Sequence, residues 1–265
     1  MAMQVIAIAN HKGGVGKTTT AVNLAASLAH RKKRVLVIDL DPQGNTTSHL
    51  GLDPFAQSLI VYDLLKRADL DPRTAIVPIN SRLDLIPSSL RMADADLALS
   101  GILLRETRLK TQVDKLDGYD FVLVDCPPNL GILTVNALFS AHEVIVCCHT
   151  NPFSWHAVRD LLATISQCMT ATGRVIVVRA LATMYDRRKT IHQQVLEEIQ
   201  QHFGTLTYDT VIPLSVKLEE ASGVGKTIVD YDQTNAGFTA YFSLSKEVIE
   251  NVKDQTKINN LETAL

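Results

Sequence analysis

Short apolar runs rich in β-branched residues alternate along the chain with segments whose apolar residues recur at helical spacing. The runs predict strands at residues 5–9, 35–39, 83–86, 121–125, 144–148 and 175–182. The periodic segments predict helices at 18–30, 94–116, 134–140, 155–169, 191–203 and 236–252, and residues 53–87 have the least regular pattern. Such alternation is typical of a mostly parallel, twisted β-sheet flanked by helices on both faces. We therefore predict an α/β fold, with residues 1–265 forming a single domain.

A glycine-rich segment, NHKGGVGKTT at residues 10–19, joins the first predicted strand to the first predicted helix. In this context it predicts a P-loop, in which glycines let backbone N–H groups approach phosphate oxygens and the helix N-terminus adds positive potential. The residues expected to bind the nucleotide are Lys12, Gly13, Gly14, Val15, Gly16, Lys17, Thr18 and Thr19. Lys17 is placed for the β- and γ-phosphates, and the Thr18 hydroxyl for Mg²⁺.

Two predicted strands end in carboxylates, Asp39 and Asp125. A carboxylate that ends an apolar strand is costly without a cation, so both are candidate Mg²⁺ residues. Asp41 follows in a loop with Pro42 and Gly44, from which a carboxylate could reach a water beyond the γ-phosphate. An aspartate before proline also begins ordinary turns, which is the structural alternative for Asp41.

Three motifs resemble those of the ParA/MinD superfamily, and most closely its ParA/Soj partition branch. They are KGGVGKTT at 12–19, the "deviant" P-loop with a second lysine, DLDPQGN at 39–45, and DCPPNLG at 125–131. The resemblance extends over nearly the whole chain. Two departures are His11, where the general P-loop pattern has its first glycine, and Asn129, where the family usually has serine.

This resemblance implies roles for several residues. Lys12 would cross a face-to-face, ATP-dependent homodimer to the partner's phosphates and act in catalysis like an arginine finger. Asp41 would activate the attacking water, and residues 125–131 would sense the γ-phosphate. Met184 and Pro213 lie in segments that flank the base, and the absence of an N-K-x-D motif favours ATP over GTP.

The net charge is −2, so any contact with nucleic acid must be a local patch. The resemblance places sequence-independent binding of double-stranded DNA, in the ATP state, at Arg188 and Lys217. Several family cations are missing from residues 214–222 and 232–237, which predicts weaker or more salt-sensitive binding. The structural alternative is that residues 187–189 are only a solvated start of a helix.

The resemblance implies a cytoplasmic, nucleoid-associated ATPase whose slow hydrolysis is stimulated by DNA and by a ParB-type centromere-binding partner. Its cargo would be a plasmid or a chromosome origin, and related ATPases position chemoreceptor clusters or carboxysomes instead. No N-terminal helix-turn-helix extension is expected, because the first predicted strand begins within a few residues of Met1.

Other functional classes fit less well. A MinD-like membrane cycler would need a basic amphipathic C-terminal helix, which the residues after Lys246 do not resemble, so no membrane binding is expected. A nitrogenase-reductase-like iron–sulfur protein would need a cysteine before Cys126. The other cysteines are Cys147, Cys148 and Cys168, and without C-x-x-C spacing all four are interpreted as reduced core residues. A second glycine-rich stretch, SGVGKT at 222–227, follows no apolar strand and is not expected to bind phosphate.

Overall fold

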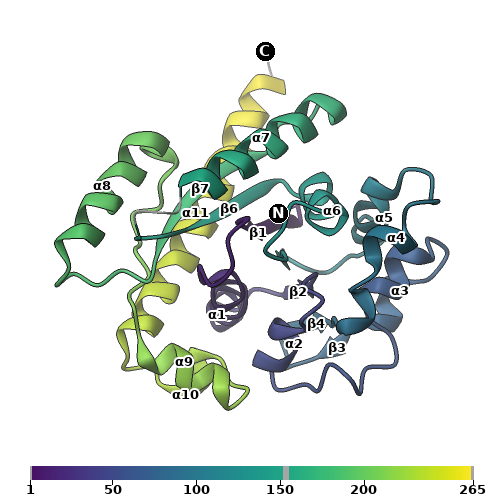
Figure 1. Cartoon of the computed structure of the whole chain (residues 1–265), viewed down its shortest axis with the longest axis horizontal. Coiled ribbons are helices and arrows are strands. Elements are labelled where there is room, and N and C mark those ends of the chain that lie inside the picture. The colour runs from purple at the N-terminus through teal and green to yellow at the C-terminus, as the bar shows by residue number, and fades with distance from the viewer. Residues whose placement is uncertain (1, 152–154, 264–265) are drawn as a thin grey trace.

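The computed structural model describes residues 2–151 and 155–263. Its centre is a seven-stranded sheet in the order β3-β4-β2-β5-β1-β6-β7 (Figure 1). The strands are β1 (Gln4–Ala9), β2 (Val35–Asp39), β3 (Val77–Pro78), β4 (Leu83–Ile86), β5 (Phe121–Asp125), β6 (Glu143–His149) and β7 (Val177–Thr183). All neighbouring pairs are parallel except the short edge pair β3 and β4. The predicted α/β fold is therefore confirmed.

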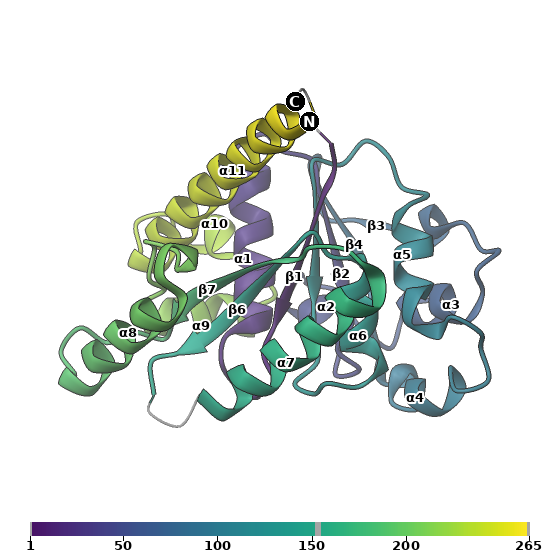
Figure 2. The ribbon, with the colours of Figure 1, turned by 90° about the horizontal axis from the view of Figure 1, so that it is seen from above.

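Helices cover both faces of this sheet, as Figure 2 shows from above. One face carries α1 (Lys17–His30), α9 (Val216–Gly223), α10 (Ile228–Tyr231) and α11 (Ala236–Thr263). The other carries α3 (Val61–Lys66), α5 (Arg108–Val113), α6 (Ile132–Ser140), α7 (Trp155–Thr172) and α8 (Thr190–Phe203). Two short helices complete the set, α2 (Asn45–His49) after β2 and α4 (Ala95–Ala98) before α5. Single 3₁₀ turns lie at Pro72–Ala75, Leu90–Met92, Arg105–Thr107 and Gly204–Leu206.

Side chains on the central strands alternate between two buried clusters. Ile6 and Ile8 of β1 pack beneath α1 and α11, whereas Val5 and Ala7 pack toward α6 and α7. Strands buried on both faces are apolar throughout, which explains why the sequence signal for them was a continuous run. The four cysteines are buried and form no disulfide, as the sequence predicted.

The predicted helix 94–116 is wrong as one element. The chain forms α4, then a turn in which Leu104 has a φ of 54°, and only then α5. Ser100 donates a hydrogen bond to the Leu97 carbonyl oxygen, and Gly101 follows; both residues favour a helix end over a helix interior. The sequence analysis also missed β3, which is two residues long, and the short helices α2, α3, α9 and α10.

Within the described residues, no helix combines the length and the apolar character that crossing a bilayer requires.

Candidate active site

The P-loop joins β1 to α1 and has a backbone that only glycine adopts readily. Gly14 and Gly16 have φ values of 68° and 85°, in the left-handed region. Gly16 immediately precedes α1, and no described side chain caps the first turn of that helix. The first N–H groups of α1 are therefore left for a ligand, and the helix dipole makes an anion the favoured one.

A cavity of about 450 Å³ lies over this loop. It is lined by Gly13, Gly14, Gly16, Lys17, Thr18, Thr19, Asp41, Gln43, Asn45, Ser48, His49, Pro128, Met184 and Ser222. Lys17 Nζ donates to the Lys12 carbonyl oxygen at 3.0 Å, so the lysine is held against its own loop. Most residues that the sequence assigned to phosphate binding thus line one cavity, together with Asp41.

The strand-end carboxylates meet because β2 and β5 are neighbours, with Asp39 in register with Asp125. Asp125 Oδ2 accepts hydrogen bonds from the hydroxyls of Thr18 and Thr46, each at 2.7 Å. Asp39 Oδ2 accepts from the backbone N–H and the hydroxyl of Thr47, at 2.9 and 2.7 Å. Asp125 Oδ1 is buried and has no hydrogen-bond partner among the described residues.

Burial raises the pKa of both carboxyls above their ordinary range, and the charge of Asp125 raises that of Asp39 further. Hydrogen bonds from Thr46 and Thr18, and the charge of Lys17, oppose the shift at Asp125. Two buried carboxylates with an unpaired oxygen are the environment that a hard divalent cation stabilises. The residues therefore fit Mg²⁺, which Thr18 and Asp125 would hold, with Asp39 close by.

Asp41 and Lys12 occupy different positions relative to the cavity. Asp41 is 7% exposed, and its Oδ1 accepts the Gln43 N–H at 3.0 Å, so the carboxylate is fixed at the cavity wall. Lys12 contributes its carbonyl oxygen to the loop through Lys17, but its side chain is not among the groups that line the cavity.

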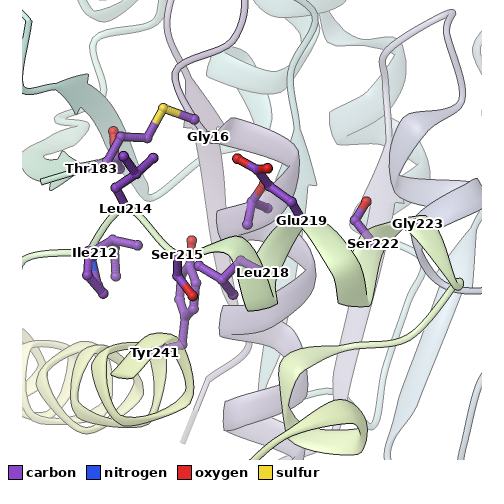
Figure 3. A pocket seen from close by; sticks show the side chains of 13 residues that line it. Gly16, Thr183, Ile212, Leu214, Ser215, Leu218, Glu219, Ser222, Gly223 and Tyr241 are labelled. Atoms are coloured by element: carbon purple, nitrogen blue, oxygen red, sulfur yellow. The ribbon is translucent and has the colours of Figure 1, made fainter. Parts of the chain in front are cut away.

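A second cavity, of about 370 Å³, adjoins the first and shares Gly16, Thr19, Met184 and Ser222 with it. Figure 3 shows it between the start of α1, the segment 212–215 and α9. Its wall is largely apolar and includes Ile212, Pro213, Leu218 and Tyr241.

Met184 has a φ of 55°, which is strained for a side-chain-bearing residue. The segments are joined by backbone pairing, since Tyr185 pairs with Pro213 as a parallel bridge. The structure thus places Met184 and Pro213 together at the second cavity, and Met184 also lines the cavity over the P-loop.

Sequence reasoning missed Thr46, Thr47 and His49. Gly44, with a φ of 64°, lets the chain turn after β2 so that α2 begins directly beneath the carboxylates. The signal was a pair of threonines soon after a glycine in the Asp41 loop. Thr47 bonds to Asp39 on the preceding strand, but the partner of Thr46, Asp125, lies on a strand distant in the sequence.

The two DNA candidates are exposed but already paired with acidic neighbours. Arg188, whose side chain is 83% exposed, donates to both carboxylate oxygens of Asp186 at 2.9 and 2.8 Å. Lys217 on α9 donates to Glu220 at 2.7 Å. Neither lines the two cavities, although Leu218 and Glu219, next to Lys217, line the second.

The second glycine-rich stretch does not form a P-loop. Residues 222–227 leave the C-terminus of α9 instead of entering a long helix, and the Thr227 side chain caps the four-residue α10. The φ of Gly225 is 66°, and a Cβ there would lie 3.0 Å from the Gly51 Cα. Its glycine is explained by close backbone packing.

His49 gives a prediction for pH-dependent stability. Burial lowers its pKa to about 4, below the ordinary 6.5, despite a hydrogen bond to the Lys226 backbone. As pH falls, the unfolded chain protonates His49 before the folded chain does. The contribution of His49 to the free energy of unfolding is therefore complete above pH 6.5 and is lost as pH falls toward 4. Between pH 7 and pH 5, wild type should therefore lose about 2 kcal/mol of unfolding free energy relative to His49→Gln.

Urea unfolding across this range checks the His49 prediction. His156→Gln, at an exposed position on α7, is the matched control and should follow the wild-type curve. Parallel wild-type and His49→Gln curves would contradict the assignment.

Three comparisons agree with this geometry. The model of the family described as "AAA domain" matches residues 3–178. The sporulation initiation inhibitor protein Soj of Bacillus subtilis is 39% identical over 251 residues, covering 94% of this chain and 99% of that protein. The chromosome-partitioning ATPase Soj of Thermus thermophilus is 41% identical, covering 94% and 96%.

Among solved structures, cobyrinic acid a,c-diamide synthase from Mycobacterium smegmatis, with bound ATP analog and magnesium, has a TM-score of 0.84 and 34% identity. The match covers 95% of this chain and 96% of that one. With a P-loop, strand-end carboxylates and near-full-length similarity to Soj proteins, the chain belongs to the ParA/Soj family of P-loop partition ATPases.

Proposed function

We propose that this protein is an ATP-driven switch that binds Mg²⁺–ATP, dimerises on it, and holds double-stranded DNA without sequence preference in that state. Slow hydrolysis to ADP and phosphate, stimulated by DNA and a ParB-type partner, then separates the dimer. The carrying observation is the buried Asp125 Oδ1, which has no hydrogen-bond partner in the described part of the chain. Asp125 also accepts the Thr18 hydroxyl, at a cavity lined by Lys17 and Asp41. This arrangement provides a site for the cation, contacts for the phosphates and a carboxylate that could orient the water, as phosphoryl transfer needs.

ATP and Mg²⁺ are supported by the two adjoining cavities and by a relative. The phosphate cavity has glycine N–H groups, Lys17 and an N-terminal helix dipole, while the neighbouring cavity is apolar enough for a flat base. The Mycobacterium smegmatis structure that resembles this chain contains an ATP analog and magnesium. Bound Mg²⁺ would neutralise charge on the β- and γ-phosphates, while Lys17 and the P-loop hold them in position.

The names of two relatives support a role in partitioning chromosomes, and we propose a ParB-type partner and a chromosome origin or plasmid as cargo. The DNA contact that we propose is made by Arg188 and Lys217, which are exposed on neighbouring segments joined by the Tyr185–Pro213 bridge. Each cation is paired with a carboxylate, so DNA phosphates would have to compete with Asp186 and Glu220. This competition explains why we expect binding to be weak and strongly dependent on salt.

The function is tested by DNA retention and phosphate release measured on the same preparations. Wild type with Mg²⁺–ATP should shift a double-stranded fragment of arbitrary sequence, and with ADP it should not. Arg188→Glu should weaken this retention at least tenfold, because it replaces a phosphate contact by a repulsive charge, while the ATP-dependent dimer persists.

Arg67→Glu is the matched control, since Arg67 is an exposed, ion-paired arginine after α3, at the other end of the sheet from α8 (Figure 1). It should retain DNA as wild type does. Absence of phosphate release with and without DNA would overturn the ATPase assignment. Unchanged retention by Arg188→Glu would move the DNA surface elsewhere.

A further inference from the structure

The loop that follows Asp125 is attached to a helix outside the P-loop region. Residues 126–131 connect β5 to α6, and Pro128 in this loop lines the phosphate cavity. At the far end of the loop, Asp96 Oδ1 on α4 accepts the backbone N–H of Ile132, the first residue of α6, at 3.1 Å. Figure 2 shows α4 beside α6. Asp96 thus supplies the cap that the α6 N-terminus does not receive from its own segment.

The end of the loop packs closely against the Asp96 side chain. A Cβ at Gly131 would lie 3.2 Å from Asp96 Oδ2 and 3.1 Å from Asn129 Oδ1, tighter than ordinary contact. Within the loop, Asn129 Oδ1 accepts the Gly131 N–H at 3.0 Å, and the Thr134 hydroxyl donates to the Asn129 carbonyl oxygen at 2.6 Å. A shift of Asp96 would therefore be transmitted to Asn129, the neighbour of Pro128.

The support beneath Asp96 is fixed to the core. Ala95 and Leu99, on either side of it in the sequence, are 2% and 0% exposed. Asp94 accepts a hydrogen bond from the Tyr62 hydroxyl at 2.7 Å, which ties the start of α4 to α3. The exposed Asp96 carboxylate consequently projects from an anchored helix turn, and its negative charge suits the N-terminus of α6.

We infer that Asp96 is a positioning residue that holds loop 126–131 at the phosphate cavity and so sets how strongly the protein prefers ATP over ADP. The inference rests on the proposed nucleotide site, and it adds Asp96 to the residues that determine which nucleotide the site prefers. The γ-phosphate is the only group that distinguishes the two ligands. Pro128 lines the cavity from the loop that ends at Ile132, whose N–H is bound by Asp96. Loss of the Asp96 contact should therefore act on the triphosphate selectively.

The test measures the Kd of Mg²⁺–ADP and of a non-hydrolysable Mg²⁺–ATP analogue by titration calorimetry. Asp96→Ala should weaken analogue binding by up to about tenfold, the limit reached if the whole free energy of one charge-assisted hydrogen bond goes into positioning the loop, and should change ADP binding less than twofold. Asp96→Asn keeps an acceptor oxygen and should restore most of the preference. Asp114→Ala is the matched control, because its exposed carboxylate pairs with Lys110 of α5 and not with the loop.

An unchanged ratio of the two Kd values in Asp96→Ala would overturn the inference, as would an equal loss of both ligands or the same change in Asp114→Ala. If Asp96→Ala does not fold, Asp96→Asn is used instead. A ratio of the ADP Kd to the analogue Kd below half the wild-type ratio in Asp96→Asn would then contradict the inference. Wild type that binds neither nucleotide would overturn the proposed function itself, and this inference with it.

Discussion

Asp41→Ala should lower the rate of ATP hydrolysis at least a hundredfold while ATP binding persists, because general-base assistance contributes roughly 10²–10⁴. The Asp41 carboxylate is held at the wall of the phosphate cavity by the Gln43 N–H, opposite the P-loop residues. The Asp41 backbone N–H donates a hydrogen bond to Asp39 Oδ1 at 3.1 Å. Because this bond does not involve the Asp41 side chain, removing that side chain should leave the Mg²⁺ site in place. The variant should accumulate as the ATP-bound dimer.

Single-turnover phosphate release, with bound nucleotide quantified in parallel, measures the Asp41 prediction. Asp53→Ala is a suitable control, because Asp53 makes the same type of turn hydrogen bond, to the Phe55 N–H at 2.8 Å, but is solvent-exposed and does not line the cavity. That control should hydrolyse ATP like wild type. Turnover by Asp41→Ala near the parent rate would remove Asp41 from catalysis and leave it a turn residue.

Local sequence signals were sufficient for six of the seven strands and for the glycines of the P-loop. The run at 121–125 gave β5 with its exact bounds, and the glycines at positions 14 and 16 have the left-handed backbone that their residue type suggests. Both features depend on neighbours along the chain. Strand apolarity follows from burial on both faces, and the glycine loop follows from its own backbone needs.

Features that depend on tertiary neighbours could not be predicted. Thr46 is a hydrogen-bond donor to Asp125 only because β2 and β5 are adjacent in the sheet, which pairs residues 79 positions apart. The contact between Asp96 and Ile132 is of the same kind. The predicted helix 94–116 failed because a helical period continued across Ser100 and Gly101, where local hydrogen bonding ends the helix.

Lys12→Ala should leave the protein monomeric with Mg²⁺ and a non-hydrolysable ATP analogue, whereas wild type should double its molar mass on replacing ADP by that analogue. The reason is that the backbone and the side chain of Lys12 have different contacts. Its backbone is fixed within the protomer, since its N–H donates to Asn10 Oδ1 at 2.9 Å and its carbonyl accepts from Lys17. Asn10 is in turn anchored to the Cys147 carbonyl oxygen on β6.

Truncating the Lys12 side chain therefore leaves the protomer's own phosphate cavity intact, and nucleotide should still bind. What is lost is an ammonium group outside that cavity, which in our proposal neutralises the phosphates of a second copy and accelerates hydrolysis as a residue supplied in trans. Light scattering after size exclusion measures the mass, and fluorescent nucleotide titration measures binding. Lys66→Ala, which removes an exposed lysine of α3, should dimerise as wild type does.

A Lys12→Ala protein that still doubles its mass with the analogue would contradict the role in trans, because dimerisation would then not require the ammonium group. A variant that no longer binds nucleotide would instead place Lys12 in its own phosphate site. The backbone contacts with Asn10 and Lys17 argue against that second outcome, since they hold the loop without the Lys12 side chain.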